Sequence, residues 1–370
     1  MAMKRLLLVG GGHAHVQVLA ALADRPFPET GVTLLSPYPR QIYSGMLPGW
    51  IAGHYAIDDC AIRIDRLAQR AGVRLVQTTC CGVDLNSKEV FCANGEKIAF
   101  DLLSIDSGPV VDLAALPGAA QHALPLRPIE EFVAAWPGLL DKARQQTEGF
   151  RLAIVGDGAA GTELAFALQA RFATEQAGHV SLILIGSHDL PLPGFPLRLR
   201  RQAASLLKTS GIVHLPRQRA AGFTADRVLL AEGRFVASDA SLIVTGAAAP
   251  HWPASSGLAT DESGFIRVNP DLRSISHAFV FAAGDVAAYA DPRPKSGVYA
   301  VRAGPVLAGN LRAACAGKAL QVWTPQTQAL YLIGTGRRHA LAARGKLSAG
   351  GYWVWRWKDW IDRRFIQRFS

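Results

Sequence analysis

Residues 151–165, RLAIVGDGAAGTELA, decide the fold of this chain. The run Arg151–Val155 is apolar after its first residue, which predicts a buried strand, and Gly156 then opens a tight turn. Gly158 and Gly161 complete the spacing GxGxxG at the start of a predicted helix. The first glycine permits the turn, the second lets a phosphate approach the backbone, and the third lets helix and strand pack closely. The stretch therefore predicts a βαβ unit that holds a dinucleotide on the positive end of its helix.

The next predicted strand, Val180–Ile185, ends without the acidic residue that commonly holds the adenosine ribose of NADH. Gly186 and Ser187 stand at that place, and Asp189 lies close enough in sequence to substitute for the missing acid. No arginine lies in the immediate turn to bind the 2′-phosphate of NADPH. The sequence therefore leaves the choice between NADH and NADPH open.

A second copy of the pattern begins the chain. It consists of a predicted strand at Arg5–Val9, a turn that contains Gly10 and Gly12, a helix from about Val16 to Leu22, and a strand at Val32–Leu35. Gly10 permits the tight turn, and Gly12 lets the backbone approach a pyrophosphate.

Two positions of this first copy depart from the pattern. His15 stands at the third-glycine position, and Ser36 ends the second strand where an acid is usual. A glycine turn in an ordinary α/β protein would give the same signal, so this copy is weak by itself. Taken with the unit at Gly156, it predicts two dinucleotide sites in one chain.

Composition limits the classes of protein to consider. The chain has 370 residues, of which 49% are hydrophobic and 18% charged, which excludes intrinsic disorder and predicts two or three domains. No apolar run reaches 18 residues, and Leu6–Val9 is too short for a signal peptide, so we expect a cytoplasmic protein. The net charge of +10 fits nucleic acid, an anionic membrane or a negatively charged cofactor. No nucleic-acid-binding motif is present, so we expect no nucleic acid.

The five cysteines do not suggest a metal or redox motif. Their number is odd, and their spacing matches neither a zinc site nor a CxxC pair. Cys80 and Cys81 follow a strand-like run, and we expect both to be buried as small apolar residues. We therefore expect no metal site.

Three further motifs, each at the end of a predicted strand, occur along the chain. Asp101–Gly108 and Ser241–Gly246 are strands that end in a hydroxyl residue and glycine, and Val280–Ala287 is a strand followed by Gly284 and Asp285. With the two glycine turns, this order resembles the flavoproteins of the pyridine nucleotide-disulfide oxidoreductase superfamily. The resemblance implies non-covalent FAD, with Asp285 holding the ribityl chain through charge-assisted hydrogen bonds, and NADH or NADPH as donor.

The resemblance also implies the architecture. We expect an α/β protein with two Rossmann-like domains and a small C-terminal α+β domain. The FAD domain comprises 1–116 and 247–322, the inserted NAD(P)H domain 117–246, and the C-terminal domain 323–370. Within this plan, Pro117–Pro137 is expected as a linker.

Candidate site residues follow from the same resemblance. The residues expected to bind cofactor are Gly10, Gly12, Ser36, Tyr43, Met46, Ser107, Gly108, Gly156, Gly158, Gly161, Glu163, Gly246, Gly284, Asp285 and Val298. The expected catalytic residues are Lys295, Glu163 and Tyr299. Lys295 would stabilise negative charge on reduced flavin or acceptor, and Glu163 would position the nicotinamide. Glu163 has a structural alternative, because an acid near a helix N-terminus is favoured by the dipole. His13 and His15 are expected to be loop neighbours or packing residues at the far end of the cofactor.

The C-terminal segment Tyr352–Ser370 is rich in tryptophan and arginine. At 100° per residue, one arc of a helix carries Trp353, Val354, Trp357, Trp360, Ile361 and Phe365. The roughly opposite side carries Arg356, Asp359, Asp362, Arg363 and Gln367. Such a helix suits a membrane surface, through Trp353, Trp357 and Trp360. The alternatives are packing on the flavin domain and a homodimer contact.

The layout resembles type II NADH dehydrogenases, single-subunit NADH:quinone oxidoreductases that dock on the membrane. It also resembles the module fused ahead of selenophosphate synthetase, through Gly11–His15, Tyr43–Gly49 and Arg293–Val298. These resemblances imply a flavoprotein oxidoreductase that passes electrons from NAD(P)H to a quinone-like acceptor, peripheral on the cytoplasmic face of the inner membrane.

The region Gln41–His54, where disulfide reductases of this fold carry their cysteine pair, contains no cysteine. We therefore expect no redox disulfide. Two alternatives stay open: a sulfide:quinone oxidoreductase-like enzyme using Cys60 and Cys315, and a flavoprotein partner in selenium metabolism with a vestigial NAD(P)H site.

Overall fold

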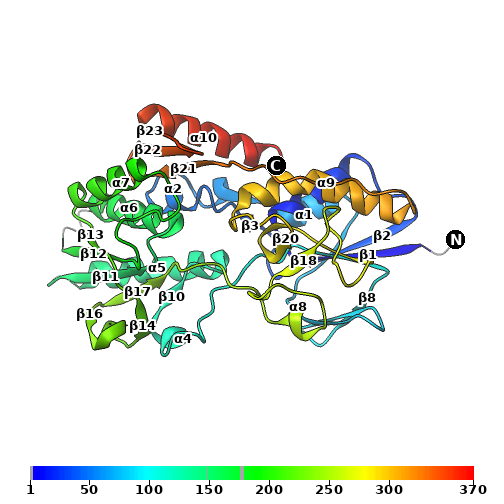
Figure 1. The fold of residues 1–370 in the computed structure, drawn as a ribbon, viewed down its shortest axis with the longest axis horizontal. Helices are drawn as coiled ribbons and strands as arrows, with labels where there is room; N and C mark the ends of the chain where they lie inside the picture. Colours follow the sequence, from blue (N-terminus) through cyan, green and yellow to red (C-terminus); the bar gives the residue numbers. More distant parts are fainter. Residues whose placement is uncertain (1–2, 147, 176–178) are drawn as a thin grey trace.

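Two five-stranded parallel sheets dominate the computed structural model, which describes residues 3–146, 148–175 and 179–370 (Figure 1). The first sheet has the order β19 (Val280–Ala282), β9 (Leu102–Ile105), β1 (Lys4–Val9), β2 (Thr30–Leu35), β5 (Arg74–Val76). The second has the order β10 (Leu124–Pro125), β17 (Ala240–Ile243), β11 (Phe150–Val155), β12 (Val180–Ile185), β13 (Val213–Leu215). The orders β9-β1-β2-β5 and β17-β11-β12-β13 correspond, so the predicted fold class, with its duplicated unit, is confirmed.

Five small sheets complete the strand inventory. They are β3 (Gln41–Ile42) with β4 (Ala61–Ile62); β6 (Cys80–Asp84), β7 (Glu89–Cys92) and β8 (Lys97–Ala99); β14 (Ala220–Phe223), β15 (Arg227–Leu230) and β16 (Phe235–Ala237); β18 (Ile266–Val268) with β20 (Ala287–Tyr289); and β21 (Leu330–Gly334), β22 (Ala340–Arg344) and β23 (Leu347–Gly351). The last of these is antiparallel and forms the small C-terminal sheet.

The helices cover the sheets and the C-terminal hairpins. They are α1 (His13–Asp24), α2 (Leu47–Ile51), α3 (Ile64–Arg70), α4 (Ala119–His122), α5 (Ile129–Gln145), α6 (Ala159–Thr174), α7 (Leu197–Thr209), α8 (Trp252–Ser255), α9 (Gly297–Cys315) and α10 (Tyr352–Gln367). α1 packs along α9, and α10 lies over the C-terminal sheet at one edge of the molecule (Figure 1). No helix in these ranges is both long and apolar enough to cross a bilayer.

Two sequence expectations were wrong at this level. The stretch 117–137 is not a plain linker: it holds α4, β10 and the first half of α5, in which Pro137 is an interior residue. Phe132, Trp136 and Leu140 recur every four residues and are buried, and this apolar face outweighs the proline. Cys81 is exposed, whereas its neighbour Cys80 is buried, because successive strand residues point to opposite faces.

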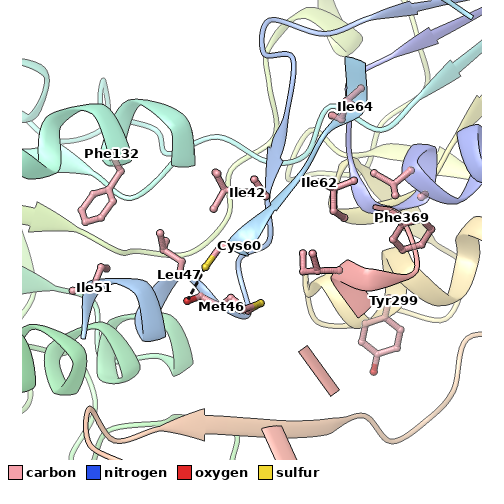
Figure 2. Close-up of a cluster of buried hydrophobic side chains, with 14 of the residues drawn as sticks. Ile42, Met46, Leu47, Ile51, Cys60, Ile62, Ile64, Phe132, Tyr299 and Phe369 are labelled. Atoms are coloured by element: carbon pink, nitrogen blue, oxygen red, sulfur yellow. Dashed lines mark hydrogen bonds between the residues drawn. The ribbon is translucent and has the colours of Figure 1, made fainter. Parts of the chain in front are cut away.

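One continuous core joins the parts that carry the candidate site. Figure 2 shows Met46 and Cys60 among buried side chains that extend from Phe132 of α5 to Phe369 at the C-terminus. The segment between β2 and α3, which contains β3, α2 and β4, therefore packs against both the middle and the end of the chain.

Candidate functional site

Both glycine turns adopt the conformation that their sequences require. Gly10 and Gly156 have φ values of +93° and +117°, and each donates its amide to the carbonyl oxygen that ends the neighbouring strand. A Cβ on Gly156 would lie 2.4 Å from the Val244 carbonyl oxygen, and one on Gly161 would lie 1.8 Å from the Gly156 carbonyl oxygen. Any side chain at these two positions would force helix and strand apart.

The turn before α6 fits the pyrophosphate of a nicotinamide dinucleotide. The amides of Asp157 and Gly158 have no hydrogen-bond acceptor among the described residues, and a Cβ on Gly158 would meet nothing within 4 Å. Free amides at a helix N-terminus, with open space in front of them, form the usual binding place for a phosphate.

The turn before α1 also keeps free amides, at Gly11 and His13, for the pyrophosphate of FAD. His15, which stands at the position of the third glycine, stabilises the turn through hydrogen bonds of its ring. Its Nδ1 lies 2.6 Å from the Gly10 carbonyl oxygen and its Nε2 lies 2.8 Å from the Ser104 hydroxyl oxygen. Burial lowers the pKa of His15 to about 4, so this side chain is neutral and structural.

A buried carboxylate, Asp106, lies beneath the same turn and was missed by the sequence analysis. It accepts hydrogen bonds from the amides of Ala14 and His15 at 2.8 and 2.9 Å. Cβ atoms on Gly12 or Gly284 would each lie 2.4 Å from this carboxyl group, so both glycines make room for it. Burial raises the pKa of Asp106 to about 8. An acid at the end of β9, where the motif has no need of one, was the available signal.

Asp285 lies where the FAD resemblance expects it, just after β19. Its side chain is largely buried and forms an ion pair with Arg127 at 3.6 Å. Lys295 is turned toward the adjacent β20, since its Nζ donates to the Ala287 carbonyl oxygen at 2.7 Å and lies 3.6 Å from the centre of the Phe265 ring. Burial lowers the pKa of Lys295 to about 8.

His13 is a neighbour of the first glycine turn, because it follows Gly12 as the first residue of α1. Its ring packs 5.5 Å from that of Tyr43 and 5.8 Å from that of Phe365, between centroids. A Cβ on Gly297, at the start of α9, would lie 3.1 Å from the His13 ring. Helix α1 begins at His13, so the side chain points toward the same face as Tyr43 and α9.

Glu163, Lys358 and Asp362 form an acid–lysine cluster beneath α10. Lys358 Nζ lies 2.8 Å from Asp362 Oδ2 and 3.9 Å from Glu163 Oε1, and it donates to the Gly45 carbonyl oxygen. Glu163 also accepts a hydrogen bond from the Gly334 amide at 2.7 Å. The cluster thus joins α6, α10, β21 and the loop before α2.

The pKa values of the cluster follow from its burial. Burial raises the pKa of Glu163 to about 7, although Lys358 and the Gly334 amide act in the opposite direction. Burial alone would lower the pKa of Lys358, but Asp362 and Glu163 outweigh it and the pKa is raised. The nearby Tyr43 hydroxyl has a raised pKa, through burial and the negative charge of Asp362. Glu163 can therefore carry a proton at neutral pH.

Helix α10 buries residues from both of its predicted sides. Asp362, from the polar side, is buried beneath the helix with Lys358, whereas Trp353, Trp357 and Trp360 are 57%, 37% and 55% exposed. Val354 and Ile366 supply the buried apolar contacts of the helix. A helical arc gives the relative directions of side chains, but it does not give the rotation of the helix against its neighbours.

A narrow cavity opens beside the cluster. Glu163 and Lys358 line it together with Tyr55, His54 and the Gly334–Arg337 turn. A wider open groove adjoins it, lined by the same turn, by Arg338 and by the end of α6. The cavity beside Glu163 has room for about one water molecule, and the groove outside it is wider.

The comparisons with known proteins agree with this geometry. A family model described as pyridine nucleotide-disulphide oxidoreductase matches residues 4–304. The chain belongs to this family. Its implied cofactors are FAD and NAD(P)H, and the free amides of the two turns fit both.

The relatives within the family are distant. The chain is 25% identical to the NADH dehydrogenase-like protein YutJ of Bacillus subtilis over 215 residues, which cover 57% of this chain and 56% of YutJ. It is 25% identical to the demethylphylloquinone reductase NdbB of Synechocystis over 296 residues, covering 77% and 72% of the two chains. The chain thus spans little more than half of YutJ and almost three quarters of NdbB.

Two solved structures share the whole fold. The sulfide:quinone oxidoreductase of Aquifex aeolicus superposes with a TM-score of 0.81 at 16% identity, covering 99% of this chain and 91% of the other. NDH2 of Plasmodium falciparum, solved in complex with NADH, superposes with a TM-score of 0.81 at 13% identity, covering 99% and 98%. These likenesses concern the fold alone.

The cysteines of this family member do not form a pair at the site. All five are free, and burial raises the pKa of Cys60 to about 12. Cys315 ends α9, where Nζ of Lys4, the first residue of β1, donates to its carbonyl oxygen. Cys60 lies beside Met46, since its Sγ is 3.9 Å from the Met46 carbonyl oxygen. Among the described residues no contact joins the two thiols that the sulfide-oxidising alternative expects.

The remaining predicted residues lie apart from the acid–lysine cluster. Tyr299 is buried in the first turn of α9, in the same hydrophobic cluster as Ile62 and Phe369 (Figure 2). Met46 is buried in that cluster too, while Ser36, Ser107 and Gly108 lie near the first glycine turn. In the described part of the chain no contact joins Lys295 or Tyr299 to Glu163, so the structure does not unite the three expected catalytic residues.

Proposed function

We propose that this chain is an FAD-dependent NAD(P)H:quinone oxidoreductase that works without a redox disulfide. The observation that carries the proposal is the juxtaposition of Glu163 and Lys358 at the narrow cavity. Glu163 stands on the helix that opens at the nicotinamide-dinucleotide turn, and Lys358 stands on the terminal helix with the exposed tryptophans. The donor side and the membrane-facing side of the molecule thus meet at one pair of charges.

When bound, FAD supplies the chemistry of accepting a hydride from NAD(P)H and releasing two electrons to an acceptor. The residues of the chain bind and orient the two cofactors. The Gly11 and His13 amides would hold the FAD pyrophosphate, Asp285 the ribityl hydroxyls, and the Asp157 and Gly158 amides the nicotinamide dinucleotide.

Reduction of a quinone to a quinol consumes two electrons and two protons. Glu163, with a pKa of about 7, holds a proton at neutral pH and can donate it, through a water molecule in the cavity, to an acceptor oxygen in the adjoining groove. Lys358 lies 3.9 Å from Glu163 and stabilises negative charge at the same place. A buried acid poised near neutral pH suits an acceptor that takes up protons with its electrons.

The exposed tryptophans support a membrane surface as the source of the acceptor. Trp353, Trp357 and Trp360 project from α10, and Arg356 and Arg364 stand exposed among them. Tryptophan beside arginine suits the boundary between headgroups and acyl chains, where quinones are available. The name of the relative NdbB, a demethylphylloquinone reductase, favours the same class of reaction. A homodimer contact through this face is the alternative.

The experiment is anaerobic mixing of the purified protein with NADH or NADPH, followed by a short-chain quinone. We expect flavin absorbance that bleaches with the donor and returns with the quinone. Flavin that neither donor bleaches, or reduced flavin that the quinone does not reoxidise, would overturn the proposal.

A further inference from the structure

The acid that the second nucleotide unit lacks at its strand end is replaced in space by Asp157. Gly186 follows β12 directly, at the place where the side chain of a ribose-binding acid would begin. A Cβ on Gly186 would lie 1.9 Å from Asp157 Oδ2 and 2.0 Å from its carboxyl carbon. The carboxylate of Asp157 therefore fills the side-chain space of the strand-end acid.

The first unit supports this reading through the same geometry. Gly11 occupies the place of Asp157 between the two turn glycines, and Ser36 occupies the place of Gly186. The Ser36 and Gly186 amides both donate at 3.1 Å to the end of the next strand, at Val76 and Leu215. A Cβ on Gly11 would lie 3.2 Å from Ser36 Oγ. The middle turn position therefore faces the strand end in both units, although only the second unit has a side chain there.

Neighbouring groups hold the Asp157 carboxylate in that orientation. Its side chain is 5% exposed, and Oδ2 lies 3.3 Å from His214 Nε2 on the adjacent strand β13. On the outer side, Oδ1 lies 3.8 Å from Nδ1 of the half-exposed His188. A ribose that displaces the His188 ring would meet Oδ1, while His214 keeps the carboxylate in place.

Asp189, the substitute suggested by sequence proximity, is placed differently. Its side chain is 64% exposed and forms an ion pair with Arg217 at the surface. It therefore lies outside the space that the strand-end acid would occupy.

We infer that Asp157 is the residue that recognises the adenosine ribose, and that it selects NADH over NADPH; this inference rests on the proposed function of the second unit as the donor site. The carboxylate accepts a hydrogen bond from the ribose 2′-hydroxyl. A 2′-phosphate would instead bring like charges together, which opposes binding.

The test measures binding without catalysis. The protein is kept in excess FAD, so that the first site is filled, and titrated calorimetrically with ADP-ribose and with 2′-phospho-ADP-ribose. We expect the wild type to bind ADP-ribose at least about tenfold more tightly. Asp157→Asn keeps the shape and the His214 contact but removes the charge, and it should bring the two affinities to within about threefold. Asp189→Asn, the matched control, should keep the wild-type ratio.

A second variant, in which the acid is moved from position 157 to position 186, keeps the inference testable if Asp157→Asn does not fold. Asp157→Gly combined with Gly186→Glu moves the acid to the strand end, and it should keep the preference for ADP-ribose. An Asp157→Asn protein that keeps the wild-type ratio overturns the inference while the donor site stands. A wild type that binds neither ligand overturns the inference and, with it, the donor side of the proposed function.

Discussion

Replacement of Lys358 by methionine tests the electrostatics of the acid–lysine cluster. The ammonium lies 3.9 Å from Glu163 Oε1 and favours the ionised form of that carboxyl group. At an effective dielectric constant of about 20, two charges at this distance interact by about 4 kcal/mol, which equals about three pKa units. We expect Lys358→Met to raise the pKa of Glu163 from about 7 by at least about one unit, since solvent and protein relaxation reduce the full effect.

The assay is the rate of quinone-dependent flavin reoxidation against pH. The rate should fall as Glu163 loses its proton, with a midpoint near pH 7 in the wild type and at least about one unit higher in Lys358→Met. Lys358→Arg keeps the charge, and Lys346→Met makes the same change at an exposed lysine, so both should keep the wild-type midpoint.

Lys358→Met should also lower the free energy of unfolding by about 3 kcal/mol, because it leaves Asp362 buried without its cation. A pH midpoint equal to that of the wild type, in a folded Lys358→Met protein with full flavin, would refute the reasoning.

Three further predictions concern separate parts of the molecule. Asp106 holds its proton up to about pH 8 in the folded protein, well above its unfolded pKa, so the free energy of unfolding should decline between about pH 4 and 8. Asp106→Asn should flatten this pH dependence in urea titrations, and an unchanged pH dependence would contradict the prediction. Asp285→Ala should lose FAD during gel filtration, at least about tenfold in affinity, and full occupancy would rule out the ribityl contact. Replacing Trp353, Trp357 and Trp360 by serine should abolish flotation with anionic liposomes while the flavin content stays unchanged. Undiminished flotation would contradict the proposal that α10 binds a membrane surface.

The fold could be predicted from the sequence because each of its motifs is a contiguous stretch of residues. The strand, glycine turn and helix around Gly156 are neighbours in the chain. The need for glycine at position 161 is explained by the structure, since a Cβ there would lie 1.8 Å from the Gly156 carbonyl oxygen. The order of the motifs then predicted two Rossmann-like domains, and the structure has two parallel sheets whose strand orders correspond. The domain boundaries, the roles of the site residues and the link to the selenophosphate synthetase module stay predictions.

The candidate site was harder to predict from the sequence because its contacts join residues that are far apart in the chain. Glu163 and Lys358 are far apart in sequence. A helical arc places Asp362 opposite the tryptophans, but it does not say which of the two sides faces the protein. Asp106 and Asp157 were each overlooked for the same reason. Their carboxyl groups matter through the glycines that face them across the turn, at Gly12 and Gly186, and only three-dimensional packing brings these positions together.

The measurement that tests the account most directly compares two acceptors in one variant. NADH-reduced wild type and Glu163→Gln would be mixed anaerobically with a short-chain quinone and, separately, with ferricyanide, which takes up electrons without protons. The account predicts that Glu163→Gln slows reoxidation by the quinone at least about tenfold and leaves reoxidation by ferricyanide unchanged. Equal rates for wild type and variant with the quinone, or equal slowing with both acceptors, would contradict it.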